Sequence, residues 1–373
     1  MELVEGSSCA AMFTQNAFCA APVVLAKKHL QASNNQVRYL LVNTGNANAG
    51  TGAEGLSAAM NCCQAVAEAT AAPTDCVLPF STGVIGEPLP SELICNAIPA
   101  AVSGLAEDNW AQAAHGILTT DTRPKGASVQ FSHEGTDYTV TGIAKGSGMI
   151  QPNMATMLAY LATDVAVEQT TLQGVLKKAV NSSFNRITVD GDTSTNDACV
   201  LVATGQAGNE PLTTESPVGL LTAFQEAVDQ LCIELAQGLI RDGEGASKFV
   251  AVVVNGGDGE QECLDVAFTI AHSPLVKTAL FASDPNWGRL LAAIGRAGLV
   301  DLAVENIALY LNDTLIAEGG CRAASYSEAQ GVAAMSPDEI EIRVELNRGA
   351  SSQTVWTTDF SYDYVRINAE YRS

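Results

Sequence analysis

Hydrophobic residues recur along the chain at the spacings of strands and helices. Residues 36–42 (QVRYLLV) are apolar and β-branched, and they lead through a Gly- and Asn-rich loop into an Ala-rich segment, 56–70, with helical spacing. A second predicted strand, 76–80, is followed by the loop STGVIGEPLP and by helices expected at about 91–106 and 110–118. The first third of the chain therefore predicts strands and helices in alternation.

The middle of the chain predicts an antiparallel hairpin. Residues 128–150 alternate polar and apolar around the Glu134-Gly135 turn, and residues 154–167 form another strand-like apolar run. Amphipathic helices are expected at 170–182 and 216–240. Strands are expected in SKFVAVVVNG (247–256), LDVAFTIAH (264–272) and EIEIRVELNRG (339–349). The pattern predicts antiparallel sheet packed with helices.

The composition indicates a folded protein with enough apolar residues for a core. Of 373 residues, 47% are hydrophobic and 16% are charged, which excludes a disordered or fibrous chain and suggests two domains or one large α/β body. The formal net charge of −22 would repel a nucleic-acid backbone and an anionic membrane surface. No stretch reaches the roughly 18 apolar residues that a membrane helix requires. We therefore expect neither nucleic acid nor membrane as a partner.

Cysteine and histidine usage indicates a metal-free protein in a reducing compartment. Several of the ten cysteines lie in apolar segments, and the first residues lack the basic and apolar pattern of an export signal. We therefore expect free, buried thiols and a cytoplasmic protein. There is no CxxC motif, and the four histidines are scattered, so the sequence offers no metal-ligand spacing.

The segment richest in candidate chemistry is KGSGMIQPNMATMLAYLATD, residues 145–164. By itself, a Thr that opens an apolar strand would be interpreted as structural. The segment is similar to the signature of the ornithine acetyltransferases, bifunctional enzymes of arginine biosynthesis that cleave themselves before a Thr within PNMATML. The resemblance covers nearly the whole chain through ordered blocks: MFTQNAFCAAPV, VNTGNANAGTG, LPFSTGVIG, LTTDTRPK, SFNRITVDGDTSTND, RDGEGASKFV, SDPNWGRLLAAIGRAG and DYVRINAEYRS. Members carry some tens of residues ahead of the first block, so we expect this sequence to lack an opening segment.

The resemblance implies a fold and a processing step. The fold is α/β (α+β), a layered sandwich of largely antiparallel sheets with helices, as in self-processing hydrolases with a Thr or Ser nucleophile. Cleavage between Ala155 and Thr156 would give an α fragment, residues 1–155, and a β fragment, residues 156–373, which stay together as an α2β2 heterotetramer. No metal or cofactor is implied, and acetyl-CoA is a co-substrate of some members.

Thr156 can supply both nucleophile and base once it is the first residue of a chain. Its hydroxyl attacks, and its own α-amine, with an ordinary pKa of about 7.7–8.0, can accept the proton. Acyl transfer also builds negative charge on a carbonyl oxygen, which needs fixed hydrogen-bond donors. The resemblance assigns this oxyanion hole to the Thr82 hydroxyl and the Gly83 amide. Seen alone, their loop would be an ordinary Gly turn after a strand.

The resemblance also assigns substrate-binding residues. Acetylornithine carries an α-carboxylate and a side-chain ammonium, so one cation and one carboxylate suit its recognition. Lys145 and Glu244 match these roles by charge, although each by itself would be interpreted as a solvated surface charge. The full substrate-binding set comprises Thr119 or Thr120, Lys145, Thr156, Glu244, Asn368 and Ser373.

These residues predict an acetyltransferase that moves acetyl from N2-acetyl-L-ornithine to L-glutamate through an acetyl-Thr156 intermediate. The alternative within catalysis is a self-processing amidase or aminopeptidase on the same fold, in which water takes the acyl group. A cofactor-binding protein is supported only by residues 50–55 (GTGAEG), which fit GxGxxG. Seven residues separate their first Gly from the preceding strand, and the next strand ends without a carboxylate. A plain Gly-rich loop is therefore favoured.

Overall fold

The chain folds into two compact units. The computed structural model describes residues 1–151 and 157–371. The first unit comprises Met1–Asn185 and Asp192–Leu239, and the second comprises Arg186–Gly191 and Ile240–Ser373. The chain thus enters the second unit briefly with six residues, returns to the first, and enters the second again inside a long helix.

The first unit is built on a five-stranded sheet. In order across the sheet, its strands are β1 (Ser8–Phe13), β8 (Ala198–Ala203), β6 (Leu158–Thr163), β5 (Thr136–Lys145) and β4 (Lys125–His133). All neighbours are antiparallel except β6 and β8. The β4–β5 hairpin turns at Glu134 and Gly135, whose φ angles of 49° and 84° suit a two-residue type I′ turn. The predicted hairpin is confirmed.

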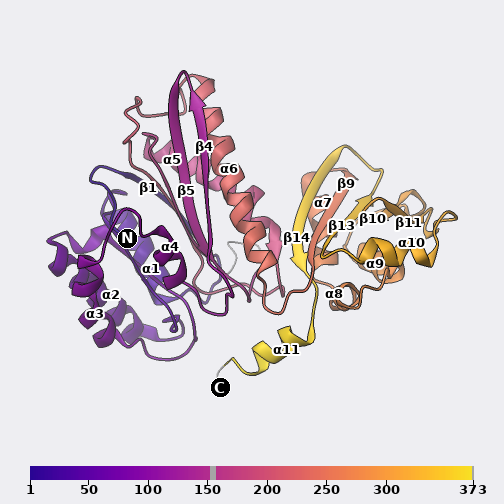
Figure 1. Ribbon diagram of the computed structural model, residues 1–373, viewed down its shortest axis with the longest axis horizontal. Coiled ribbons are helices and arrows are strands. Elements are labelled where there is room, and N and C mark those ends of the chain that lie inside the picture. Colours follow the sequence, from indigo (N-terminus) through magenta and orange to yellow (C-terminus); the bar gives the residue numbers. More distant parts are fainter. Residues whose placement is uncertain (152–156, 372–373) are drawn as a thin grey trace. The chain divides into compact units, whose positions relative to one another are not determined.

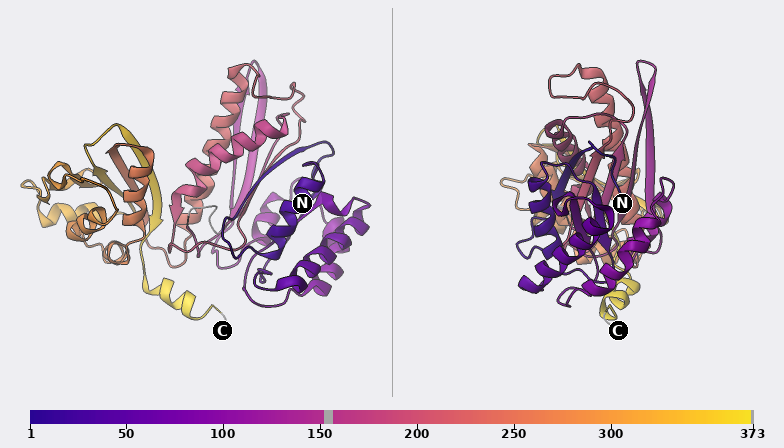
Figure 2. Two further views of the ribbon diagram at one scale, coloured as in Figure 1. Left: turned by 180° about the vertical axis from the view of Figure 1, so that it is seen from behind. Right: turned by 90° about the vertical axis from the view of Figure 1, so that its left-hand side faces the viewer.

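Helices and a second, two-stranded sheet cover this sheet (Figure 1). The parallel strands of the second sheet are β2 (Tyr39–Asn43) and β3 (Val77–Ser81), and the helices are α1 (Ala21–Ala32), α2 (Gly52–Thr70), α3 (Ser91–Ser103), α4 (Trp110–Gly116), α5 (Gln169–Ser182) and α6 (Val218–Arg241). Helices α5 and α6 lie on one face (Figure 2). There α5 packs against β1 and β8, and Leu231 and Leu235 of α6 approach Gly142 of β5.

The other face of the five-stranded sheet shares a buried core with β2, β3 and α4. Leu40, Leu78 and Phe80 meet Leu158 and Tyr160 in this core, and the rings of Phe80 and Tyr160 pack edge to face. The far side of the β2–β3 pair is covered by α2 and α3 through a separate cluster. The layers therefore run helix, sheet, sheet, helix, which is the layered sandwich expected from the resemblance.

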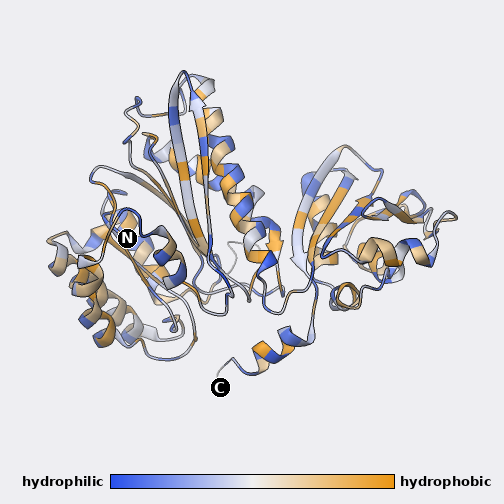
Figure 3. Cartoon of the chain, in the orientation of Figure 1, coloured by the Kyte–Doolittle hydropathy of each residue, from blue (hydrophilic) through white to orange (hydrophobic). Residues whose placement is uncertain are grey.

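The second unit contains a seven-stranded sheet. Its strands, in order, are β12 (Cys321–Arg322), β11 (Thr314–Glu318), β10 (Ala308–Leu311), β13 (Glu339–Glu345), β9 (Phe249–Gly257), β14 (Ser351–Thr358) and β7 (Ile187–Thr188). Its helices are α7 (Glu260–Ala271), α8 (Pro274–Phe281), α9 (Trp287–Gly295), α10 (Glu328–Met335) and α11 (Tyr362–Ala369). Hydrophobic residues concentrate on the parallel neighbours β9 and β13 (Figure 3). Helix α11 carries both hydrophilic and hydrophobic residues, and none of its residues is buried. Short 3-10 turns cover Thr74–Cys76, Phe184–Arg186 and Val304–Asn306.

The strand expected at LDVAFTIAH is wrong, because these residues belong to α7. The buried residues of α7 include Cys263, Val266, Ala267 and Ile270, which follow helical i, i+3, i+4, i+7 spacing rather than alternation. This stripe packs against β9 and β14. Tertiary packing of the stripe overrides the strand preference of Val266 and Ile270.

Most of the cysteines are buried, as the composition predicts. All ten cysteines are free thiols, and six of them are buried, five in the first unit and Cys263 of α7 in the core of the second. In the described ranges, no helix combines the length and apolar character needed to cross a membrane.

Candidate active site

Three of the predicted site residues lie outside the described residues. They are Ala155 and Thr156, at the expected cleavage position, and Ser373. The site is therefore built from Met157, the next residue along the chain, and from the remaining predicted residues.

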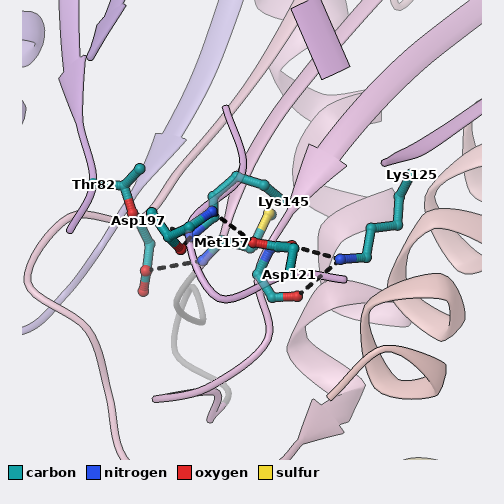
Figure 4. A network of polar contacts seen from close by, with 8 residues as sticks. Thr82, Asp121, Lys125, Lys145, Met157 and Asp197 are labelled. Atoms are coloured by element: carbon teal, nitrogen blue, oxygen red, sulfur yellow. Dashed lines mark hydrogen bonds and ion pairs between the residues drawn. The ribbon is translucent and has the colours of Figure 1, made fainter. Parts of the chain in front are cut away.

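Lys145 ends β5 and is buried, with 4% of its surface exposed. Its ammonium donates hydrogen bonds to the hydroxyl oxygens of Thr119 (2.8 Å) and Thr82 (3.1 Å). It also lies 3.9 Å from a carboxylate oxygen of Asp121 (Figure 4). A solvated surface charge is thus the wrong interpretation for Lys145, since burial of an ammonium is tolerated only with such partners. Thr120 makes no side-chain hydrogen bond in the described part of the chain, so Thr119 is the Thr that joins this cluster.

Asp121 balances the charge of two buried lysines. Its side chain is fully buried, and it accepts hydrogen bonds from Lys125 Nζ (2.5 Å) and from the Gly146 amide (2.8 Å). Burial by itself would raise the pKa of Asp121, but Lys145 and Lys125 outweigh that effect and lower the pKa below its ordinary value. Asp121 is therefore ionised at neutral pH and holds both ammonium groups at the end of the sheet.

The loop after β3 presents the predicted oxyanion donors. Thr82 is 9% exposed, and because its oxygen accepts from Lys145, its own hydroxyl hydrogen is directed elsewhere. The Gly83 amide donates no hydrogen bond within the described residues, and Gly83 has a φ of 129°. A Cβ at Gly83 would lie 2.3 Å from the backbone carbon of Gly45, so only glycine fits. The loop thus offers a hydroxyl and an amide that are both available to a substrate oxygen.

Asn196 and Asp197 connect this loop to the residue that follows position 156. The Asn196 amide donates to the carbonyl oxygens of Ser81 (2.9 Å) and Ala47 (2.7 Å). One carboxyl oxygen of Asp197 accepts from the Met157 amide at 3.2 Å (Figure 4). Full burial raises the pKa of Asp197 well above its ordinary range, although Ser194, the Met157 amide and Lys145 each lower it.

Glu244 and Asn368 lie in the second unit and contact each other. Glu244 is 7% exposed, and its carboxylate accepts a hydrogen bond from the Asn368 amide at 2.8 Å. Asn368 lies on α11, whose first turn is capped by Ser361, and the Ser361 hydroxyl donates to the Gly245 carbonyl. The surface-charge interpretation is wrong for Glu244 too, because its carboxylate is buried and accepts a hydrogen bond from the Asn368 amide.

Comparison with known proteins identifies the family. The model of the ArgJ family matches residues 1–373. The chain belongs to the ArgJ family. It is 60% identical to the arginine biosynthesis bifunctional protein ArgJ of Pseudomonas syringae pv. tomato and 55% identical to that of Methylococcus capsulatus, in both cases over all of this chain and 91% and 90% of the relative. The crystal structure of the arginine biosynthesis bifunctional protein ArgJ from Bacillus halodurans is 40% identical, with a TM-score of 0.54 over 57% of this chain and 98% of that chain.

The predicted site residues of this ArgJ-family chain fall into two groups. Thr82, Gly83, Thr119 and Lys145 cluster in the first unit, and Glu244 and Asn368 pair in the second. Sequence reasoning missed Asp121, Asn196 and Asp197, although they lie in the blocks LTTDTRPK and SFNRITVDGDTSTND. A polar residue within such a block, next to a strand end, is the signal that could have singled them out.

The Gly-rich loop at residues 50–55 closes on itself. The Asn48 amide donates to the Gly55 carbonyl (2.9 Å), and the Thr51 hydroxyl donates to the Asn48 side-chain oxygen (2.7 Å). A Cβ at Gly55 would meet the Thr51 side chain, so this glycine makes room for its own loop. These contacts favour the plain-loop interpretation over a dinucleotide-binding turn. Among the described residues, no group of three His, Cys, Asp or Glu side chains has the arrangement of a metal site.

Proposed function

We propose that this chain is a cytoplasmic, self-processing acetyltransferase of arginine biosynthesis that moves acetyl from N2-acetyl-L-ornithine to L-glutamate through an acetyl-Thr156 intermediate. Membership of the ArgJ family and relatives named for arginine biosynthesis support the pathway. The observation that carries the chemistry is the buried Lys145 ammonium, which is shared by Thr82 and Thr119 at the strand end before the predicted cleavage position. No metal or cofactor is part of the proposal.

The proposed acyl transfer uses Thr156 as nucleophile and its α-amine as base. The substrate carbonyl oxygen becomes negative in the transition state, where the Thr82 hydroxyl and the Gly83 amide donate to it. Since Lys145 donates to the Thr82 oxygen, it polarises that hydroxyl and fixes the direction of its hydrogen. Two preset donors then act without any rearrangement during the reaction.

Substrate recognition is proposed to rely on charged groups that are already buried. The ammonium of Lys145 suits the α-carboxylate that acetylornithine and glutamate share, with the Thr119 hydroxyl as a second polar contact. Glu244 suits the side-chain ammonium of ornithine, and Asn368 orients its carboxylate. Ser373 and Thr156 complete the proposed set.

Cleavage between Ala155 and Thr156 is compatible with an intact first unit. The strands on the two sides of the cut, β5 and β6, are antiparallel neighbours from Val140 opposite Thr163 to Lys145 opposite Leu158. Strands β1 and β8 also pair across the two fragments. The fragments 1–155 and 156–373 would therefore share one sheet and stay associated, and their assembly as α2β2 is part of the proposal.

The test compares acetylornithine with and without glutamate. We expect ornithine release to depend on glutamate and to match acetylglutamate formation mole for mole. Equal ornithine release without glutamate, with free acetate as the product, would identify the self-processing amidase instead. A parallel reaction with acetyl-CoA and glutamate, without acetylornithine, determines whether acetyl-CoA is a second acetyl donor.

A further inference from the structure

Two consecutive residues contact the two halves of the proposed catalytic centre. Asn196 donates to the carbonyl of Ser81, the residue before Thr82, and Asp197 accepts from the amide of Met157, the residue after position 156. Both side chains are buried, with exposures of 7% and 1%. A single peptide bond therefore separates the group that holds the oxyanion loop from the group that holds the start of β6.

The backbone of this pair is fixed from both sides. The Asp197 carbonyl accepts from the Thr14 amide at 3.0 Å, and the next residue, Ala198, donates to the Met157 carbonyl at 3.1 Å. From Ala198 onward, β8 lies between β1 and β6. Movement of the Asp197 backbone would disturb these two hydrogen bonds, so the Cα from which the side chain extends is held in place.

The second carboxyl oxygen of Asp197 points to a role beyond packing. This oxygen, Oδ2, is buried and makes no hydrogen bond of normal length and angle within the described residues, although Ser194 lies near enough to lower the pKa of the carboxyl. A buried polar atom without a partner costs roughly 1–3 kcal/mol, which the single hydrogen bond from the Met157 amide offsets only in part. The raised pKa of Asp197 agrees with a carboxyl that keeps its proton and accepts one amide.

We propose that Asn196 and Asp197 are positioning residues for acyl transfer, which set the separation between the Thr82–Gly83 donors and residue 156. The inference rests on the proposed function, because it gives the pair its purpose through Thr156. Asn196 acts through the Ser81 carbonyl, and Asp197 acts through the Met157 amide. Neither residue is required to touch the substrate.

The expected effect is on turnover rather than on binding. A displacement of about 1 Å between a nucleophile and its oxyanion donors can reduce the rate about 100-fold. Lys145 and Thr119, which bind substrate in the proposal, lie on β5 and in the segment before β4 and contact each other directly, so their positions depend less on this pair than the Thr82–Gly83 loop does. The KM for acetylornithine should therefore change little.

The experiment uses the full chain with D197A, D197N, N196A and the matched control N209A. Asn209 also bonds backbone groups through its side chain, the amide and carbonyl of Ala166 and the carbonyl of Glu210, but beyond the far end of β6. We expect D197A and N196A to reduce kcat about 100-fold, to slow cleavage before Thr156, and to leave KM within about threefold of the wild type. D197N keeps an acceptor for the Met157 amide and mimics a protonated carboxyl, so it should recover most of the activity. N209A should match the wild type.

The outcomes distinguish the positioning role from the proposed function. Wild-type kcat and cleavage in both D197A and N196A would overturn the inference while leaving the proposed function intact. A loss in N209A as large as in D197A would show a general effect of removing a polar contact, and a D197N as inactive as D197A would show that the carboxyl itself is needed. Either result overturns the positioning role. If D197A fails to fold, as judged by thermal unfolding, the test uses N196A and D197N, and wild-type kcat in N196A then overturns the inference. A wild-type chain that neither cleaves nor transfers acetyl refutes the proposed function itself.

Discussion

Removal of the Thr82 hydroxyl should reduce acetyl transfer without weakening substrate binding. In T82A, the oxyanion loses one of two proposed donors and keeps the Gly83 amide. The Lys145 ammonium loses its 3.1 Å contact with Thr82 but retains Thr119 at 2.8 Å and the Asp121 carboxylate at 3.9 Å. The cluster should therefore remain in place, and the change is confined to a single donor.

The magnitude follows from the value of one oxyanion donor. Loss of such a donor typically reduces kcat about 10²- to 10³-fold, or about 2.7–4 kcal/mol of transition-state stabilisation. Because the hydroxyl hydrogen of Thr82 is left free by Lys145, its full value should be realised in the transition state. The carbonyl of the bound substrate carries little charge, so KM should change by less than about threefold.

The assay measures initial rates of acetylglutamate formation as both substrates are varied, on fully cleaved enzyme so that slow processing does not imitate slow turnover. T82S is the matched control, since it keeps the hydroxyl and loses a methyl worth roughly 1 kcal/mol of packing. T82S should retain most of the activity. A raised KM with unchanged kcat in T82A, or an equal loss in T82S, would contradict the assignment of Thr82 to the oxyanion hole.

Three other predictions address processing, kinetics and stability. The 373-residue chain should separate on a denaturing gel into pieces of 155 and 218 residues, with Thr156 first in the larger, whereas T156A should stay whole; an uncut, fully active wild type would contradict the mechanism. Double-reciprocal plots at several glutamate concentrations should be parallel, and acetylornithine alone should add one acetyl group to the fragment that begins at Thr156; intersecting plots with no acetylated fragment would indicate direct transfer. Burial lowers the pKa of Lys277 to about 7 despite Asp359 and Asp190, so the folded state is penalised increasingly as pH falls from about 10 to about 7. In denaturant titrations, the free energy of unfolding of K277M relative to the wild type should therefore increase as the pH is lowered from about 10 to about 7. A difference independent of pH would contradict the lowered pKa of Lys277.

Local patterns in the sequence were sufficient for much of the fold. The β4–β5 hairpin follows from alternation around Glu134-Gly135, because the turn type and the side-chain period are set within a few residues. Helices α2, α3 and α6 follow from apolar spacing in the same way. Local pattern was not sufficient for the segment 264–272. It contains β-branched residues in a run that also has helical spacing, and packing against β9 and β14 selected the helix.

The sequence also determined the family and the residue types of the candidate site, since ordered blocks of a known family are local features. Tertiary structure decided which of those residues are buried together. Lys145 meets Thr82 across 63 residues of chain, Asn196 meets Ser81 across 115, and Asp197 meets Met157 across 40. The sequence suggested solvated charges at Lys145 and Glu244 because lysine and glutamate are usually exposed. Burial of a charge depends on partners that other strands bring within about 3–4 Å, and no local pattern records which strands become neighbours.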